Sequence, residues 1–124
     1  MKLFRSHNPD YADGGQMRDF VYLQDVANMC VWLMNNTPES GLYNVGSGTA
    51  RTFLDLAKAV FDALGLPEQI SFVDTPEDIR DKYQYFTEAD LSKIRNAGYH
   101  ERNTALEEGV SDYVLNYLEK GAYF

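Results

Sequence analysis

The hydrophobic pattern is clearest over residues 53–64, "FLDLAKAVFDAL". Apolar residues recur there at helical spacing and share one face: Leu56, Val60, Phe61 and Leu64. This spacing predicts an amphipathic helix with one buried side. Thr52 is a good N-cap in front of it, and Gly65 is a good residue to end it. We therefore expect a helix over 53–64 with defined caps at both ends.

Two more stretches have the same period. One predicts a helix that is capped by Asp25 and runs to about Asn36. Its buried face consists of Val26, Met29, Cys30 and Leu33. The other predicts a last helix that begins at Thr104, where Glu107 completes a capping box. Its apolar stripe consists of Leu106, Val110, Tyr113, Val114 and Tyr117.

Short runs of β-branched and aromatic residues predict strands between the helices. There are four of them, at residues 20–23, 41–46, 70–73 and 83–86. A short helix capped by Thr87 and ending near Gly98 follows the fourth run. Few short strands with three to four helices predict an α/β or α+β-like fold. Because the strands are too short for a free-standing parallel sheet, we expect a lobe that leans on another structure.

Composition narrows the possible functions. The chain has 124 residues and a net charge of −8, so it has no broad basic face, and we expect no nucleic-acid partner. Cys30 is the only cysteine, which favours a reducing cytoplasm, and its apolar neighbours predict a buried thiol. No apolar run approaches the roughly 20 residues of a membrane span. His7 and His100 lie far apart, so we expect no metal site.

The stretch "YNVGSGTAR", residues 43–51, resembles a phosphate-binding glycine loop between a strand and a helix. Arg51 takes the place of the third glycine, where a long side chain would obstruct helix packing. Asp74 lies 26 residues after Gly48, whereas an acid about 20 residues on is usual. We therefore interpret the loop as a strand-to-helix connection. The catalytic Tyr-x-x-x-Lys signature does not occur at any of the nine tyrosines.

The segment "QMRDFVYLQDVANM", residues 16–29, resembles the Arg-Asp-Phe-Val-Tyr-Val-x-Asp-Val segment of extended short-chain dehydrogenase/reductases that act on nucleotide sugars. The stretch "YNVGSG" resembles the Asn-(Leu/Ile/Val)-Gly-x-Gly loop that follows it in that family. In the family this loop belongs to the C-terminal substrate-binding lobe. The resemblance covers nearly all of the chain in the same order.

Two other segments narrow the resemblance to the ADP-heptose epimerase branch of the family. They are "KLFRSHNPDYADGGQMRDFVY", residues 2–22, and "RDKYQYFTEADLSKIRNAGY", residues 80–99. The resemblance implies that residues 1–124 form the C-terminal substrate-binding lobe, and that the N-terminal NADP-binding Rossmann domain is absent from this chain. In that branch, C6″ of an ADP-heptose destined for the lipopolysaccharide inner core is inverted. We expect no cofactor binding and no turnover by this chain alone.

The resemblance also implies a set of substrate-binding residues. Arg18 matches the arginine that contacts the nucleotide sugar, and a guanidinium can fork onto diphosphate oxygens. Its structural alternative is an ion pair with Asp19 or Asp25. Tyr83 matches a substrate-contacting tyrosine, with a core aromatic as the alternative. The segment lining the same pocket comprises Phe4, Arg5, Ser6 and His7.

Two other interpretations stay open. The chain could be the corresponding lobe of another nucleotide-sugar epimerase or dehydratase, with a different substrate. It could instead be a small stand-alone nucleotide-binding module that uses the Gly46–Gly48 loop. Removal of the Rossmann domain from such a lobe should expose an apolar patch, so we expect oligomers or rearranged contacts, with a homo-oligomer as the expected form.

Overall fold

The computed structural model describes residues 1–123. Its elements are β1 (Lys2–Phe4), β2 (Met17–Asp19), α1 (Leu23–Asn36), β3 (Ala50–Thr52), α2 (Phe53–Leu64), β4 (Ser71–Val73), α3 (Glu77–Arg80), α4 (Ser92–Asn96) and α5 (Leu106–Tyr113). The last helix continues as a π-helical turn, Val114–Leu118. The expected mixture of helices and short strands is confirmed. Within residues 1–123, no helix is both long enough and apolar enough to cross a bilayer.

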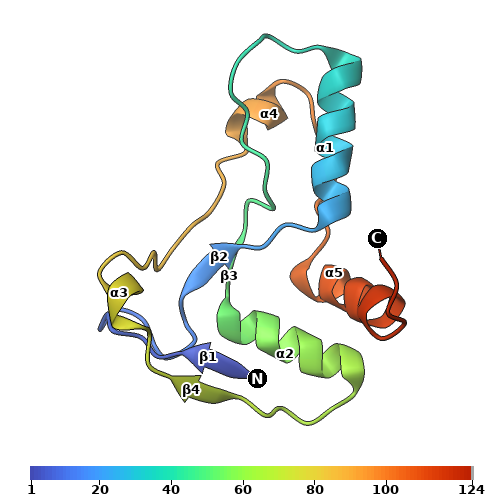
Figure 1. Cartoon of the computed structure of the whole chain (residues 1–124). Helices are drawn as coiled ribbons and strands as arrows, with labels where there is room; N and C mark the ends of the chain where they lie inside the picture. The colour runs from blue at the N-terminus through green and yellow to red at the C-terminus, as the bar shows by residue number, and fades with distance from the viewer. Residues whose placement is uncertain (124) are drawn as a thin grey trace.

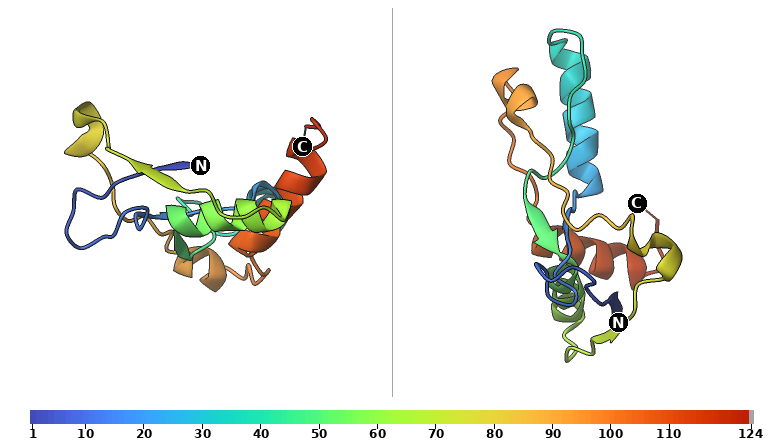
Figure 2. Two further views of the ribbon diagram at one scale, coloured as in Figure 1. Left: turned by 90° about the horizontal axis from the view of Figure 1, so that it is seen from below. Right: turned by 90° about the vertical axis from the view of Figure 1, so that its left-hand side faces the viewer.

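The strands form two small pairs. β1 and β4 are parallel, with Leu3 opposite Phe72, and β2 and β3 are antiparallel, with Arg18 opposite Arg51. Figure 1 shows α1 and α4 at one end of the molecule, and β1, β4 and α3 at the other. The β2–β3 pair lies between these ends. In Figure 2, α2 and α5 run beside each other, and these two helices share the most extensive contact between elements.

The caps predicted for α2 are confirmed. The Thr52 hydroxyl accepts a hydrogen bond from the Asp55 amide at 2.9 Å, and the Asp55 carboxylate accepts one from the Thr52 amide at 3.1 Å. This reciprocal pair satisfies two amides of the first turn. Gly65 ends the helix with φ +64°, which a residue without Cβ adopts at little cost. The fully buried side chains are Ala57 and Ala59, while the predicted stripe is half-buried.

The start of α1 differs from the prediction. The strand expected over 20–23 is wrong, because β2 ends at Asp19 and α1 begins at Leu23. Asp25 lies in the first turn and is not the N-cap. Its carboxylate accepts hydrogen bonds from the Thr104 amide at 2.7 Å and hydroxyl at 2.9 Å, and so joins α1 to the segment before α5. Cys30, which we expected to be buried, is exposed.

Two further predicted strands are wrong. Residues 41–46 and 83–86 form no strand. The second segment still runs beside β2, because the Met17 amide donates to the Tyr85 carbonyl at 2.8 Å and the Thr87 amide donates to the Met17 carbonyl at 3.3 Å. These two backbone bonds hold the segment without forming a ladder. The predicted strand over 70–73 is confirmed as β4.

The last two helices begin later than predicted. α4 begins at Ser92 and not after Thr87, although its end near Gly98 is correct. α5 begins at Leu106, and Glu108 accepts the hydrogen bond from the Ala105 amide at 3.1 Å. Glu107 is not available for this cap, because its carboxylate pairs with Arg51 at 2.6 Å.

A small core joins α1 to α4. Its fully buried members are Met29, Ile94 and Tyr99. Trp32 packs edge-on against Tyr99, with ring centroids 5.6 Å apart. This cluster fixes the end of the molecule farthest from β1 and β4, and it leaves the opposite surface of α1 exposed, including Val31 and Met34.

Candidate functional site

Arg18 lies on β2 between two aromatic rings. Its guanidinium carbon is 5.4 Å from the centroid of the Tyr83 ring and 5.7 Å from that of the Phe53 ring. Its Nη1 donates a hydrogen bond to the Met17 carbonyl at 2.7 Å. These two cation–π contacts and the hydrogen bond to Met17 favour this position of the side chain.

The charge of Arg18 has no acidic partner in the described part of the chain. Within residues 1–123 no carboxylate lies within ion-pair distance of it. The two expected alternatives, Asp19 and Asp25, are both occupied by other donors. A positioned guanidinium without a carboxylate can bind an anion such as a phosphate group in a forked geometry.

Phe4 and Tyr83 complete an aromatic surface beside Arg18. Their ring centroids are 6.1 Å apart and the rings are nearly perpendicular, at 85°. Both side chains are half-buried. The structure thus brings together three of the predicted residues, Phe4, Arg18 and Tyr83, from three segments that are far apart in the sequence.

The other predicted residues have different surroundings. Arg5 lies 3.5 Å from both Asp13 and Asp74, in exposed ion pairs of little energetic value. The Ser6 hydroxyl donates to the Asn8 carbonyl at 2.7 Å. The His7 side chain is exposed, and the contact that positions His7 runs from its amide to the Tyr85 hydroxyl at 2.9 Å. The structure therefore does not bring these three side chains to Arg18.

Two buried polar residues that the sequence pattern did not reveal hold the segment around Phe4. Gln16 Nε2 donates to the carbonyls of Phe4 at 3.4 Å and Arg5 at 3.3 Å. The Thr75 hydroxyl donates to the same Arg5 carbonyl at 3.1 Å. Both side chains are about 1% exposed, so these hydrogen bonds are shielded from water. The carbonyl groups that these side chains bind are distant in sequence. The sequence signal for this role is weak, since it consists of a polar residue beside each strand.

The Gly46–Gly48 loop binds an anion from within the chain. The Asp19 carboxylate accepts hydrogen bonds from the Ser47 amide (2.7 Å) and hydroxyl (2.6 Å), the Gly48 amide (3.0 Å) and the Ala89 amide (2.8 Å). A Cβ added at Gly46 would lie 2.7 Å from Asp19 Oδ2 and 2.6 Å from the Ala89 Cβ. The glycine is therefore needed for this close approach. Because Asp19 occupies these amides, the loop does not fit the pyrophosphate of a dinucleotide.

Neighbouring contacts support the same structural role for the loop. Asn103 Nδ2 donates to the carbonyls of Gly46 at 3.3 Å and Ser47 at 2.7 Å. Arg51, in place of a third glycine, bridges Asp55 at 3.3 Å and Glu107 at 2.6 Å. It thereby links α2 to α5, which explains why the position holds a long cationic side chain.

The loop contacts lower the pKa of Asp19 below its ordinary value of 3.8. Burial acts to raise this pKa, but the hydrogen bonds from the Ser47 hydroxyl and from the Ala89, Ser47 and Gly48 amides together outweigh it. The pKa of Asp55 is also lowered, since hydrogen bonds from Thr52 and Arg51 outweigh its burial. A carboxyl whose folded-state pKa lies below its unfolded value stabilises the fold above the unfolded pKa. That stabilisation is lost as the pH falls through the folded pKa.

We therefore expect the free energy of unfolding to fall as the pH drops below about 4. Urea unfolding at a series of pH values between about 6 and 2.5 measures this dependence. The Asp19→Asn variant should be less stable near neutral pH and lose less stability on acidification, because one depressed carboxyl is missing. Constant stability across this pH range, or the same acid dependence in both proteins, would contradict a lowered pKa of Asp19.

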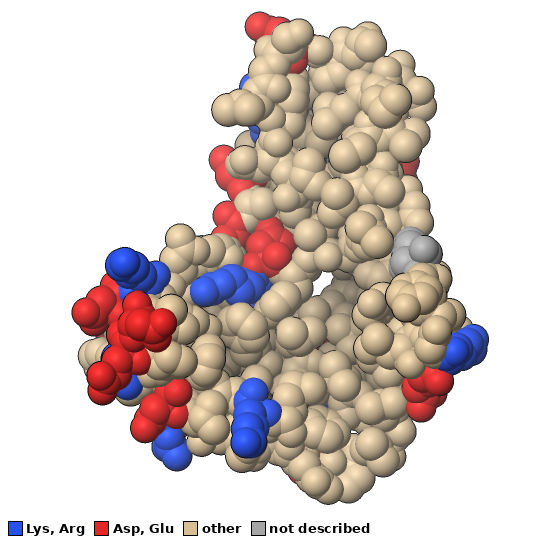
Figure 3. All heavy atoms as spheres, in the orientation of Figure 1, with Lys and Arg blue, Asp and Glu red and all other residues tan. Residues whose placement is uncertain are grey.

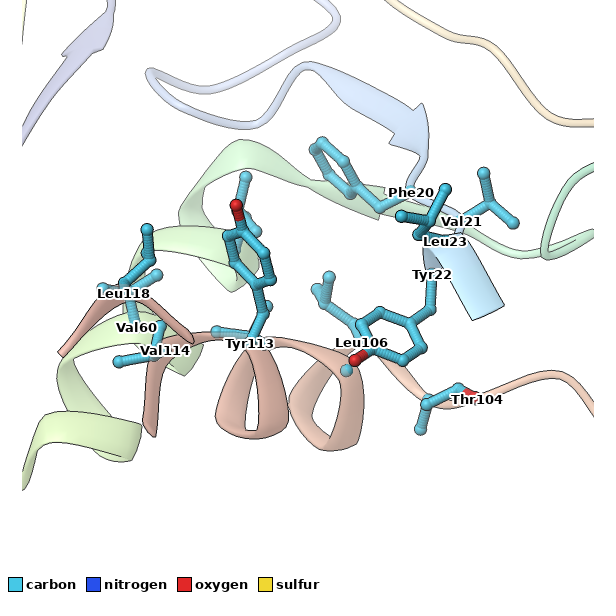
Figure 4. A pocket seen from close by; sticks show the side chains of 14 residues that line it. Phe20, Val21, Tyr22, Leu23, Val60, Thr104, Leu106, Tyr113, Val114 and Leu118 are labelled. Carbon is cyan, nitrogen blue, oxygen red and sulfur yellow. The ribbon is translucent and has the colours of Figure 1, made fainter. Parts of the chain in front are cut away.

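A separate apolar pocket of about 360 Å³ lies between α2, α5 and the segment after β2. Figure 4 shows Phe20, Tyr22 and Leu23 on one side, and Tyr113, Val114 and Leu118 on another. The Tyr22 hydroxyl donates to the Asp112 carboxylate, and burial together with this hydrogen bond raises the pKa of Tyr22 to about 12. None of the predicted substrate-binding residues lines this pocket.

Charged and apolar side chains lie on different parts of the surface. Figure 3 shows acidic and basic side chains gathered over the corner that contains α3, whereas the visible surface of α1 is largely uncharged. Leu23, Val31 and Met34 of α1 are more than half exposed. Within residues 1–123, no group of three or more His, Cys, Asp or Glu side chains is arranged to hold a metal ion.

Comparison with known proteins gives consistent matches. The model of the NAD dependent epimerase/dehydratase family matches residues 5–46. The ADP-L-glycero-D-manno-heptose-6-epimerase of Nitratidesulfovibrio vulgaris (strain DP4) is 52% identical over 118 residues, which are 95% of this chain and 36% of that protein. The enzyme of the same name from Fusobacterium nucleatum subsp. nucleatum is 44% identical over 126 residues, covering 97% of this chain and 38% of the relative.

Solved structures show the same fold. The Helicobacter pylori ADP-L-glycero-D-manno-heptose-6-epimerase matches with a TM-score of 0.70 and 29% identity, over 94% of this chain and 32% of that one. UDP-glucose 4-epimerase from Bifidobacterium longum, in complex with NAD+ and UDP, matches with a TM-score of 0.75 over 96% of this chain and 34% of that one. At 22% identity, the second match shows the fold alone.

The fold and these matches point to one class: the chain is similar to proteins of the NAD dependent epimerase/dehydratase family, whose model matches residues 5–46. The relatives that it matches over nearly its whole length are ADP-L-glycero-D-manno-heptose-6-epimerases, and it spans 36–38% of the two described above. The family resemblance found in the sequence is confirmed.

Proposed function

We propose that this chain is the C-terminal substrate-binding part of an epimerase that inverts C6″ of ADP-glycero-manno-heptose. The observation that carries the proposal is the guanidinium of Arg18, which contacts the rings of Phe53 and Tyr83 and has no carboxylate within ion-pair distance among residues 1–123. The 52% identity to an ADP-heptose epimerase over 95% of the chain supports the choice of substrate.

Each part of the site has a role in this proposal. Arg18 forks onto the diphosphate, where it makes charge-assisted hydrogen bonds. Tyr83 covers apolar surface of the ligand and offers its hydroxyl to a polar group, and Phe4 packs beside it. In this proposal the segment Arg5–His7, whose Arg5 carbonyl is held by Gln16 and Thr75, follows Phe4 and lines the outer part of the substrate site.

The rest of the reaction belongs to another part of a longer protein in this proposal. A Rossmann domain would bind NADP and provide the Tyr-x-x-x-Lys pair for the transient oxidation at C6″. The residues present here do not fit that role, since Asp19 occupies the loop amides that a pyrophosphate would need. We therefore propose that the chain alone neither binds NADP tightly nor turns over substrate, and that the full enzyme makes lipopolysaccharide inner-core precursor in the cytoplasm.

The proposal also concerns an apolar surface that is exposed in this chain. Leu23, Val31 and Met34 expose more than half of their side chains along α1. In the isolated chain such a surface favours self-association, and we propose a homo-oligomer.

Isothermal titration of the purified chain with ADP-heptose, and with UDP- and dTDP-sugars, tests the choice of substrate. We expect ADP-heptose to bind at least about tenfold more tightly, which corresponds to about 1.4 kcal/mol of discrimination. Tighter binding of a UDP- or dTDP-sugar would instead support the alternative, the lobe of another nucleotide-sugar epimerase or dehydratase. If titration calorimetry instead showed that NADP binds to this chain and that Gly48→Val abolishes the binding, the result would support a stand-alone nucleotide-binding module.

A further inference from the structure

The aromatic surface continues beyond Tyr83. The rings of Tyr83 and Tyr85 meet edge to face, with centroids 5.5 Å apart. The ring of Tyr11 follows at 5.2 Å from Tyr85, tilted by 38°. Arg18 therefore lies at one end of a row of rings, and Tyr11 lies at the other. Both Tyr11 and Tyr85 are half-buried, so part of each ring remains accessible.

The loop that carries Tyr11 is held by its own hydrogen bonds. The Tyr11 amide donates to the Asn8 carbonyl at 3.1 Å, and the Asp10 amide donates to Asn8 Oδ1 at 3.0 Å. The Asn8 amide in turn donates to the Ser6 hydroxyl at 3.2 Å. A ring on such a preorganised turn binds a ligand with less loss of entropy than a ring on a mobile loop.

The same loop is anchored to the rest of the site. The His7 amide donates to the Tyr85 hydroxyl at 2.9 Å, and the Ser6 amide donates to Asp13 Oδ1 at 2.8 Å. These contacts fix the position of Tyr11 relative to Tyr85 and, through it, relative to Tyr83 and Arg18.

The two ends of the row of rings differ in charge. The Arg18 end has a cation that none of the carboxylates in the described part of the chain pairs with. The Tyr11 end is flanked by Asp10 and Asp13, and Asp13 is paired with Arg5 at 3.5 Å. A diphosphate is attracted to the first end and repelled from the second, whereas an uncharged aromatic base tolerates the acidic end.

We propose that Tyr11 is a specificity-determining residue whose ring stacks on the nucleobase of the nucleotide sugar, while Arg18 binds the diphosphate. The inference rests on the proposed function, which puts a nucleotide sugar at Arg18. A nucleotide has the same order of groups as the row, with a charged diphosphate at one end and a planar base at the other. Stacking on an aromatic side chain is a general way to bind a base.

Titration calorimetry with two probes tests the role of Tyr11. ADP carries both a base and a diphosphate, whereas inorganic pyrophosphate carries no base. We expect Tyr11→Leu to weaken ADP binding about tenfold and to change pyrophosphate binding less than about twofold, while Tyr11→Phe keeps ADP binding within about twofold. Tyr123→Leu is the matched control, because Tyr123 is 96% exposed at the other end of the chain.

The outcomes separate the inference from the proposed function. Unchanged ADP binding in Tyr11→Leu, or equal losses for ADP and pyrophosphate, would overturn the role of Tyr11 and leave the proposed site at Arg18. Failure of the unaltered chain to bind either probe would overturn both. If Tyr11→Leu does not fold, the ring protons of Tyr11 in the unaltered chain provide a second readout: they should shift upfield on addition of ADP, and no shift would overturn the inference.

Discussion

An Arg18→Ala substitution is expected to weaken binding of an ADP-sugar by about ten- to a hundredfold. The guanidinium makes hydrogen bonds to charged oxygens in the proposed complex, and such bonds are worth about 1.5–3 kcal/mol each. Its position between Phe53 and Tyr83 is already fixed in the unbound chain, so little entropy is lost when it binds. Isothermal titration with ADP-heptose measures the effect.

Two matched variants make this result specific. Arg18→Lys keeps the charge and loses the forked geometry, so we expect an intermediate loss of affinity. Arg102→Ala removes an exposed arginine that pairs with Glu108, away from the site, and should leave binding within about twofold. Equal affinities of the unaltered chain and Arg18→Ala would show that the ligand does not bind at this guanidinium.

The largest effect on stability is expected at Asp19. Replacing Asp19 by alanine leaves the amides of Ser47, Gly48 and Ala89 without their acceptor in a half-buried place. Each such group costs about 1–3 kcal/mol when it is shielded from water, and partial solvation lowers the sum. We expect a loss of roughly 2–4 kcal/mol in the free energy of unfolding, measured by urea denaturation at neutral pH.

Asp90 provides the control for this experiment. It is an exposed aspartate whose carboxylate accepts a hydrogen bond from the Ser92 amide at 2.8 Å. Asp90→Ala should therefore destabilise the chain much less than Asp19→Ala does. If Asp19→Ala were no more destabilising than Asp90→Ala, the glycine loop would not be held by the Asp19 carboxylate.

Local signals predicted the parts of the fold that depend on neighbouring residues. The bounds and both caps of α2 follow from Thr52, Asp55 and Gly65, all within or next to the helix, so the sequence pattern was sufficient. The end of α1 at Asn36 and the strand at β4 were predicted for the same reason. In each case the apolar periodicity and the flanking residues favour the same structure.

Long-range contacts decided the rest. Asp25 has the chemistry of a helix cap, but Thr104, 79 residues away, provides its donors. Glu107 fits a capping box, but it pairs with Arg51, 56 residues earlier. No local pattern contains such partners. The segment around Tyr85 illustrates the same limit, because two backbone hydrogen bonds to the distant Met17 help to hold it beside β2.

The candidate site was found through family resemblance and not through periodicity. Arg18 and Tyr83 lie 65 positions apart, and no spacing rule connects them. The structure adds that they are in contact and that Phe4 packs against Tyr83. It also explains the glycine loop, since only three-dimensional contacts show that Asp19 occupies its amides.

The most direct test of the proposed site is an NMR titration of the ¹⁵N-labelled chain with ADP-heptose. We predict that the largest amide shifts occur at residues 4–7, at Arg18 and at Tyr83, with small changes at residues 46–48. Largest shifts at residues 46–48, with residues 4–7, Arg18 and Tyr83 unchanged, would contradict a substrate site at Arg18 and would place the ligand at the glycine loop.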